Sequence, residues 1–289
     1  MLAAGAGKRL RPLTDKLPKP LAPVGGRPVA ARVLERLSRL DLDAVALNLH
    51  HGAELIERVL GPGPVYLREQ WLRGTAGALA GAADFLRHGD FLVASADGVH
   101  EVDLSALVAR HRDSGAAATI TAKRIPRPET CALVELDEHG LVQRFVEKPP
   151  TAEVFTDLAS IGIYCFTPAV LDLIPHDRPF DIARELIPAL LQAGMPVAAY
   201  ETGAWWSDIG SPGELLAANL EYGFVSEDSL IADGAVIEAP VMIGPGSTVG
   251  WGARVSGSLV FPGAIVVARV TVENAIHGDA DDVLSVWLR

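Results

Sequence analysis

The chain has 289 residues, of which 49% are hydrophobic, and a formal net charge of −11. This apolar content excludes a disordered chain and allows one large or two modest domains. The acidic balance excludes non-specific nucleic-acid binding, which needs clustered cations, but it permits a nucleotide pocket with a few local cations.

The two cysteines, Cys131 and Cys165, have neither a disulfide-framework spacing nor a metal-binding spacing. The sequence contains no apolar run long enough to span a bilayer, and it begins with a Gly/Lys/Arg/Pro segment rather than a signal peptide. We therefore expect a cytoplasmic protein that binds no membrane.

Strand-like and helix-like runs alternate through the first two hundred residues. We predict strands at 44–49, 65–68, 91–95 and 117–122, and helices at 53–60, 76–87 and 104–112. This alternation predicts a Rossmann-like α/β fold, with a mostly parallel sheet and helices on both of its faces. Ligands of such sheets bind beyond the carboxyl ends of the strands.

From residue 130 to 164 the strand-like runs follow one another without long helices. This change predicts a small antiparallel insert or edge that covers the site. Helices are expected again at 179–193 and 212–222.

After residue 226, apolar residues recur at every sixth position, at Ile231, Ile237, Ile243, Val249, Val255, Phe261 and Val267. This period, with glycines close behind, is typical of a left-handed β-helix of hexapeptide repeats; an irregular β-rich tail is the alternative. We therefore predict a catalytic domain at 1–225 and a short β-helical tail at 226–289. Because repeats stack to bury their faces, the tail should pack on the main domain or on another subunit.

A glycine-rich basic turn, Gly5-Ala6-Gly7-Lys8-Arg9, follows the strand end Leu2–Ala4. It is neither a Walker A loop nor a dinucleotide fingerprint, because Leu2, Arg9 and Leu10 stand where those motifs need other residues. Glycines let the backbone approach an anion, and arginine offers two donors to phosphate oxygens. The turn therefore predicts a phosphate-binding loop.

The pattern Gly-x-Gly-x-Arg-Leu-x-Pro-Leu-Thr, followed by Lys19-Pro20 and Pro23-Val24-x-Gly26-x-Pro28, resembles the signature of the sugar-phosphate nucleotidyltransferases. Other segments resemble that family in order and spacing, namely Gly74–Leu79, Asp97, Glu147-Lys148-Pro149, Ser160–Tyr164 and Trp206–Pro212. The resemblance covers residues 2–222. It implies an enzyme that joins an NTP to a sugar 1-phosphate, forms a nucleoside-diphosphate sugar and releases pyrophosphate.

The resemblance also implies roles for single residues. Arg9 would hold the β- and γ-phosphates, Lys19 would lie at the α-phosphate, and Lys148 would bind the sugar phosphate. Asp97 and Asp208 would bind Mg²⁺, which takes one or two carboxylates together with phosphates. The nucleotide would contact Leu2, Ala4, Gly5, Gly7, Lys8, Arg9, Glu69, Gly74 and Thr75, and the sugar phosphate would contact Asp97, Gly98, Glu147, Lys148 and Gly162.

The base and the sugar stay open at this point. Aligned on Gly74, Glu69 lies where thymidylyl and uridylyl members of the family often have glutamine. A carboxylate only accepts hydrogen bonds, which suits the N1–H and amino group of guanine. We therefore favour GTP with a mannose- or heptose-type 1-phosphate. The alternative is dTTP or UTP with glucose 1-phosphate, because Gln70 is adjacent and a shift of one residue reverses the argument.

Other activities also stay open. A non-catalytic regulatory subunit, a hexapeptide-repeat acyltransferase and a cytidylyltransferase for a phosphorylated alcohol are the competing interpretations. The chain departs from the family at Ser160-Ile161, which replaces Asn-Ala, and at Met1, where the first strand is short or the true start lies upstream. We expect a homodimer or homotetramer, because the tail has apolar edges to cover.

Overall fold

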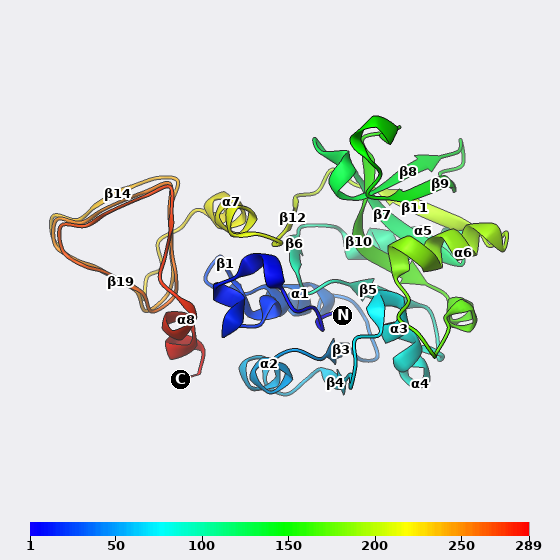
Figure 1. The fold of residues 1–289 in the computed structure, drawn as a ribbon, viewed down its shortest axis with the longest axis horizontal. Helices are drawn as coiled ribbons and strands as arrows, with labels where there is room; N and C mark the ends of the chain where they lie inside the picture. Colours follow the sequence, from blue (N-terminus) through cyan, green and yellow to red (C-terminus); the bar gives the residue numbers. More distant parts are fainter. Residues whose placement is uncertain (289) are drawn as a thin grey trace.

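A computed structural model describes residues 1–288, and Figure 1 shows a body of sheet and helices beside a coil with a triangular outline. The strands of the main sheet are β3 (Ala46–Leu49), β4 (Val65–Arg68), β5 (Phe91–Ala94), β7 (Ala118–Arg124), β10 (Leu158–Phe166) and β11 (Val197–Glu201). Leu2 forms parallel bridges to Asn48 in β3 and to Ser95 after β5, so the strand order is β4–β3–Leu2–β5–β10–β7–β11.

The sheet is mixed because β10 runs antiparallel between β5 and β7, whereas its other strands share one direction. The residues that we expected to form an antiparallel insert or edge thus supply a central strand. The physical reason is that β10 is buried along nearly its whole length, which suits a strand covered on both faces. The remainder of that segment forms the hairpin of β8 (Ala132–Leu136) and β9 (Val142–Glu147).

Beside Gly162, β10 changes its partner on one side. Ala159 and Ser160 pair with β8, whereas the residues from Ile163 onward pair with β5. Gly162 lies between the two groups with a left-handed φ of 79°. The sheet therefore divides at this glycine, with the β8–β9 hairpin on one side and the end of β5 on the other.

Helices cover both faces of the sheet, as the sequence predicts. Tyr164 and Phe166 of β10 belong to a core with α3 and α6, whereas Ile163 and Cys165 belong to a core with α1 and α5. Alternate residues of one strand point to opposite faces, so each face has its own helices. The helices are α1 (Val29–Leu37), α2 (Ala53–Leu60), α3 (Gly74–Gly81), α4 (Ala83–Leu86), α5 (Leu104–Ser114), α6 (Ile187–Gln192), α7 (Pro212–Tyr222) and α8 (Ala280–Trp287).

Two expected helices differ from the prediction. The helix expected at 76–87 begins at Gly74 and is divided into α3 and α4 at Ala82. The helix expected at 179–193 begins as a π-helical turn, Ile182–Leu186, which Asp181 caps by accepting from two backbone N–H groups. Asp181 satisfies donors that a helix start leaves free, so the helix begins there.

The tail winds through three parallel sheets of three short strands each. The sheets are β13–β16–β19 (Leu230–Ile231, Thr248–Val249, Ile265–Val266), β14–β17–β20 (Val236–Glu238, Arg254–Ser256, Thr271–Glu273) and β15–β18–β21 (Met242–Ile243, Leu259–Val260, Ile276–His277). Paired residues such as Val236 and Arg254 are 18 apart, and Arg254 and Thr271 are 17 apart, so each turn of the coil takes about three hexads. Two positions of the predicted repeat are out of register, because the second turn is one residue shorter. Val260 and Val266, rather than Phe261 and Val267, pair with Ile243 and Val249. Val267 is 59% exposed, whereas Val266 is fully buried.

The coil packs on the main body, which was one of the two expected arrangements. Met242 and Ile243 of the coil share a hydrophobic core with Leu215 and Ala218 of α7. Figure 1 shows α7 beside the coil and above β1 (Pro23–Val24), which forms a hairpin with β2 (Arg27–Pro28). Within residues 1–288, no helix combines the length and apolarity that crossing a membrane requires.

Asn219 joins α7 to this hairpin, and it provides a test of the packing. Its Oδ1 accepts from Gly25 N at 2.9 Å, and its Nδ2 donates to Pro23 O at 3.0 Å. Because the side chain is fully buried, Asn219→Ala leaves polar backbone groups without partners and should lower the free energy of unfolding by about 3 kcal/mol. Urea denaturation measures the change, with exposed Glu221→Ala on the same helix as control. A loss below about 1 kcal/mol would contradict this role.

Candidate active site

The basic turn after Leu2 is held in shape by Gly7. Gly7 has a left-handed φ of 61°, and its carbonyl accepts from Thr14 Oγ1 at 2.9 Å. A Cβ at this position would lie 2.9 Å from Lys19 Cβ, so the chain passes directly over Lys19. Gly5, Lys8 and Arg9 are exposed, as a loop that binds phosphate requires.

Asp97 and Asp208 meet although they are 111 positions apart in the sequence. The short strands β6 (Gly98–His100) and β12 (Trp206–Asp208) form an antiparallel ladder in which Gly98 pairs with Asp208. Ile209 N also donates to Asp97 O at 2.9 Å. A Cβ at Gly98 would lie 3.0 Å from Ser207 O, so glycine permits the close approach that sets the two carboxylates side by side.

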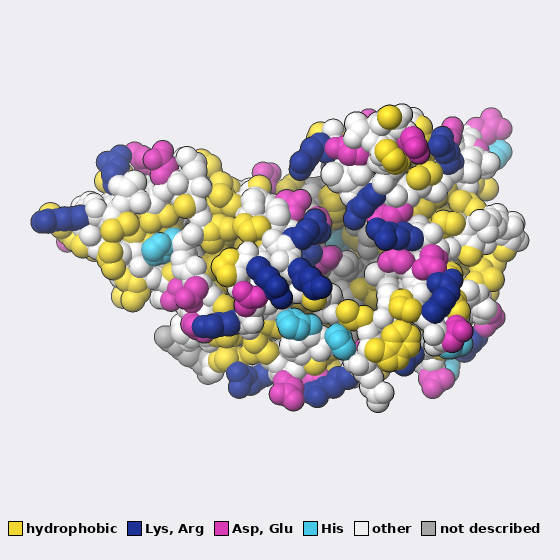
Figure 2. All heavy atoms as spheres, viewed as in Figure 1, with side chains coloured by type: hydrophobic (Ala, Val, Ile, Leu, Met, Phe, Trp, Pro, Cys, Tyr) yellow, Lys and Arg dark blue, Asp and Glu magenta, His cyan; other side chains and the backbone are white. Residues whose placement is uncertain are grey.

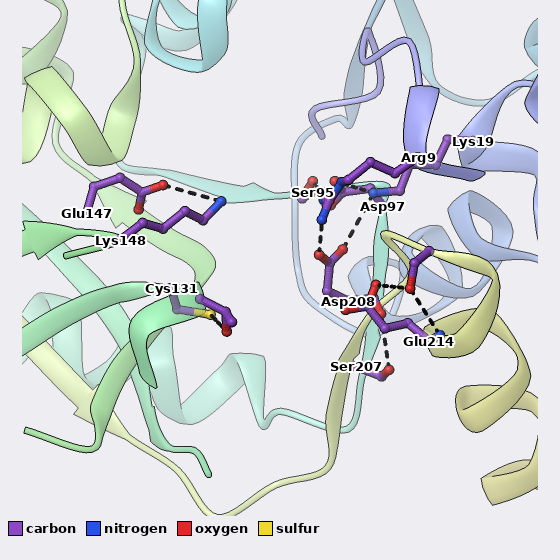
Figure 3. A network of polar contacts seen from close by, with 12 residues as sticks. Arg9, Lys19, Ser95, Asp97, Cys131, Glu147, Lys148, Ser207, Asp208 and Glu214 are labelled. Atoms are coloured by element: carbon purple, nitrogen blue, oxygen red, sulfur yellow. Dashed lines mark hydrogen bonds and ion pairs between the residues drawn. The ribbon is translucent and has the colours of Figure 1, made fainter. Parts of the chain in front are cut away.

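Lys19 connects the loop to both carboxylates. Its Nζ lies 2.8 Å from Asp97 Oδ2 and 3.5 Å from Asp208 Oδ1, and its side chain is only 9% exposed. The guanidinium of Arg9 lies 3.8 Å from Asp208 Oδ2 and is 70% exposed. Figure 3 shows these four side chains converging from the loop and from the β6–β12 ladder.

The two carboxyl groups have opposite pKa shifts. Burial raises the pKa of Asp97, but the charge of Lys19 and the hydrogen bonds from Lys19 and Ser95 outweigh it, so the pKa is lowered. Burial also raises the pKa of Asp208; Lys19 and Arg9 oppose this effect, while Asp97 and Glu214 add to it, and the pKa stays raised. Lys19 and its neighbours therefore outweigh the effect of burial on the pKa of Asp97, whereas Lys19 offsets it only in part for Asp208.

Glu147 and Lys148 lie across from this group. Lys148 Nζ is 3.5 Å from Glu147 Oε1, and the Lys148 side chain is 52% exposed. Lys148 has a φ of 47°, and its N–H donates to Cys131 O at 3.0 Å, which fixes the bend after β9. In Figure 3 the Lys148 side chain extends toward the Arg9–Lys19 side, and Figure 2 shows Lys and Arg side chains gathered around a central hollow on this face.

Gly162 borders open space. No atom lies within 4 Å of where its Cβ would be, although it sits at the partner change of the central strand. Any side chain there would enter that space and would also need the left-handed backbone that glycine adopts easily.

Glu69, Gly74 and Thr75 lie near the start of α3. Thr75 Oγ1 donates to Asp181 Oδ2 at 2.8 Å and accepts from Ile182 N at 2.7 Å. A Cβ at Gly74 would lie 2.6 Å from Phe180 O, so these two residues pack against the segment that begins at Phe180. Glu69 contacts β3 instead, because its Oε1 accepts from Asn48 Nδ2 at 2.9 Å.

The paired aspartates suit a divalent cation. Among the described residues, no group of three or more His, Cys, Asp or Glu side chains could hold a metal. Asp97 and Asp208 are a pair, and their side chains are 46% and 36% exposed. Mg²⁺ commonly takes one or two carboxylates and completes its octahedron with substrate phosphates and water, so this pair fits it.

A model of the nucleotidyl transferase family matches residues 1–223. The chain belongs to this family. A mannose-1-phosphate guanylyltransferase of Mycobacterium tuberculosis is 30% identical, with 94% of this chain and 82% of the relative covered. A UTP–glucose-1-phosphate uridylyltransferase of Synechocystis is also 30% identical, over 93% of this chain and 86% of its own. Like its relatives, the protein is an enzyme.

A crystal structure of a putative glucose-1-phosphate thymidylyltransferase from Bacillus anthracis superimposes with a TM-score of 0.68. The superposition covers 78% of this chain and 94% of the Bacillus anthracis chain, at 23% sequence identity. This likeness supports the fold of the nucleotidyltransferase rather than its substrates.

The structure adds residues that the sequence analysis did not single out. The Ser95 hydroxyl donates to the Asp97 carboxylate, and the Thr14 hydroxyl donates to the Gly7 carbonyl. The Asp181 carboxylate accepts from the Thr75 hydroxyl. Asn48 donates to Glu69. The signal that could have identified Asn48 is its place as a polar residue inside the apolar run 44–49.

The two loop glycines give a matched pair of variants. Gly7→Ala should lower the free energy of unfolding by about 1–3 kcal/mol, because the new side chain needs a left-handed backbone and meets Lys19. Gly5→Ala should change it by less than about 0.5 kcal/mol, since no atom lies within 4 Å of its Cβ position. Chemical denaturation compares the two, and equal losses would refute the role given to Gly7.

The opposite pKa shifts predict opposite stability effects. The lowered pKa of Asp97 stabilises the folded state above the ordinary pKa of 3.8, and this stabilisation is lost as the pH falls through the lowered pKa. The raised pKa of Asp208 destabilises the folded state above that raised pKa.

At pH 7 and without substrate, Asp97→Asn should therefore lower the melting temperature, whereas Asp208→Asn should leave it equal or higher. Both aspartates are partly exposed, so the changes should be a few degrees or less. The effect of Asp97→Asn should disappear as the pH falls through the lowered pKa of Asp97, and the effect of Asp208→Asn should disappear as the pH falls from the raised pKa of Asp208 through the ordinary value of 3.8. Differential scanning fluorimetry across pH measures them. A large destabilisation by Asp208→Asn would contradict the assignment.

Proposed function

We propose that this nucleotidyltransferase transfers a nucleoside monophosphate from an NTP to a sugar 1-phosphate with the help of Mg²⁺, forming a nucleoside-diphosphate sugar and pyrophosphate. One observation carries the proposal: Lys19 lies between Asp97 and Asp208, beside the exposed Arg9 and across from Lys148. These cations and paired carboxylates are what two phosphate-bearing substrates and a divalent ion need.

The chemistry requires positioning more than proton transfer. An oxygen of the sugar phosphate attacks the α-phosphorus of the NTP, a P–O bond forms, and the bond to the β-phosphate breaks as pyrophosphate leaves. The nucleophile is already ionised near pH 7, since the second pKa of a phosphate is about 6. No strong general base is needed, and orientation with charge stabilisation provides the acceleration.

Each basic residue has a distinct task in this proposal. Arg9 is exposed and can turn to the β- and γ-phosphates, where its planar donors match the oxygens. Lys19 is buried below the loop and offsets charge that grows at the α-phosphate. Lys148 binds the sugar phosphate from the opposite side, and Glu147 accepts from sugar hydroxyls. The open space at Gly162 would let the sugar approach the backbone.

Asp97 and Asp208 would hold the Mg²⁺. When bound, the ion draws charge from the reacting phosphates and helps to align them. Without substrate, Lys19 and Arg9 neutralise the two carboxylates. Phosphates that attract Arg9 would free Asp208, so binding of the nucleotide and binding of the ion should favour each other.

Glu69 supports GTP as the nucleotide. The carboxylate of Glu69 lies against β3 and accepts from Asn48, whereas the neighbouring Gln70 is exposed. This arrangement favours Glu69 over Gln70 as the residue that meets the base. A carboxylate held this way can accept the two adjacent donors of guanine. We therefore propose GTP with a mannose- or heptose-type 1-phosphate, and dTTP or UTP with glucose 1-phosphate as the alternative.

The remaining parts of the proposal concern assembly. We propose that residues 1–225 form the catalytic domain and that 226–289 form a left-handed β-helix of hexapeptide repeats. Leu230 and Ile265, which are 70% and 61% exposed, leave apolar surface on the coil, which supports a homodimer or homotetramer. The presence of Arg9, Lys19 and Lys148 with both aspartates argues against a non-catalytic regulatory subunit.

The test is a matrix of NTPs against mannose, heptose, glucose and N-acetylhexosamine 1-phosphates, with pyrophosphate release as the readout. Turnover should need Mg²⁺ and should stop when EDTA is added. Asp97→Asn should lower kcat by about 100-fold or more, because the ion loses a charged ligand. Asp233→Asn, the same substitution at an exposed position of the coil, is the control.

Two results would count against the proposal. If no pair of substrates released pyrophosphate, the assigned reaction would be wrong. If Asp97→Asn left magnesium-dependent turnover unchanged, the reaction could stand but the metal assignment would be wrong.

A further inference from the structure

Asn48 is a polar side chain in a strand whose neighbours, Leu47 and Leu49, are fully buried. Both ends of its amide are hydrogen-bonded to parts of the nucleotide site. Its Oδ1 accepts from Ala3 N at 2.8 Å, and its Nδ2 donates to Glu69 Oε1 at 2.9 Å. One side chain thus contacts the segment that enters the phosphate-binding loop and the carboxylate assigned to the base.

The contact with Ala3 replaces a bond of the sheet. Met1 faces β3, since Met1 N donates to Ala46 O and Asn48 N donates to Met1 O. In a continuing parallel ladder, Ala3 would face β3 as well and donate to a backbone carbonyl. It donates to the Asn48 side chain instead. Because Ala3 is buried, its N–H needs this acceptor, and Asn48 anchors the chain two residues before Gly5.

The contact with Glu69 fixes the direction of a carboxylate. Glu69 N donates to Leu49 O at 2.7 Å, which sets the backbone. Glu69 Oε1 accepts from Asn48, and Oε2 accepts from Arg73 N at a longer 3.4 Å. A carboxylate has about four acceptor positions, so both oxygens can still receive donors from a ligand. Asn48 provides the shorter of the two bonds that orient the group.

We propose that Asn48 is a positioning residue for nucleotide selection, which holds Glu69 in the orientation that reads the base and ties it to the triphosphate loop. This inference rests on the proposed function. The base and the triphosphate belong to one molecule, so the spacing between their two sites determines whether both can be occupied together. Asn48 fixes that spacing through a single planar amide.

The experiment measures base selectivity in Asn48→Ala and Asn48→Asp. Selectivity is the ratio of kcat/KM for the preferred NTP to that for the next best NTP, with the same sugar phosphate. Both variants should lower the ratio about tenfold, the size expected for one hydrogen bond to a charged group. Asn48→Asp keeps an acceptor for Ala3 N but repels Glu69, so its loss of selectivity reports the orientation of Glu69 rather than loop anchoring.

A double-mutant cycle tests whether Asn48 acts through Glu69. In the background of Glu69→Gln, Asn48→Ala should change the selectivity ratio by less than about twofold. The matched control is Gln143→Ala, because the Gln143 amide also donates to a carboxylate, that of Asp137 at 3.1 Å, but in an exposed hairpin turn. This control should leave the ratio unchanged. Thermal melts identify any variant that fails to fold.

An unchanged ratio in folded Asn48→Asp, or effects of Asn48→Ala and Glu69→Gln that simply add, would overturn the inference. Failure of the proposed function looks different, because the wild-type protein would then release no pyrophosphate with any substrate pair. In that case the same variants are compared by the calorimetric Kd values of GTP, UTP and dTTP, and a Kd ratio unaffected by Asn48→Asp would again overturn it.

Discussion

The contact of the Lys19 ammonium with two carboxylates is the interaction on which the site depends. A buried ammonium is costly without partners, and Asp97 with Asp208 supplies them. The contact requires three separate segments to be in place: the turn at Gly7, the end of β5 and the β6–β12 ladder. The ion pairs of Lys19 with the two aspartates thus couple the local geometry of the loop to the topology of the sheet.

The central strand β10 connects the Lys19 side of the site to the side that carries Glu147 and Lys148. Because β10 pairs with β8 before Gly162 and with β5 after it, one continuous strand carries both walls of the site. The β8–β9 hairpin bears Glu147 and Lys148, and β5 leads to Asp97. Because β10 is buried along nearly its whole length, the separation between the Lys148 side and the Asp97 side of the site is set by the core rather than by loops.

Much of this could be predicted from local sequence, and the remainder depends on tertiary contacts. The bounds of α2, β4 and α7 match the prediction because clear signals mark their ends, such as Gly61 directly after α2 and Pro212 as the first residue of α7. The central place of β10 in the sheet could not be predicted, because an apolar run does not show which strands it pairs with. The exposure of Val267 was missed because a coil turn of 17 residues does not follow a strict six-residue period.

The same distinction applies to the site. Residues to which the motifs assign a chemical role, such as Arg9 and Asp208, have a recognisable spacing, and the structure brings them together. Asn48 has no motif, because its role comes from what lies at each end of its amide. The formal charges of Lys19, Arg9 and the two aspartates sum to zero. In the proposed reaction, substrate phosphates that attract the cations would leave the carboxylates unneutralised, and a divalent cation would restore the balance.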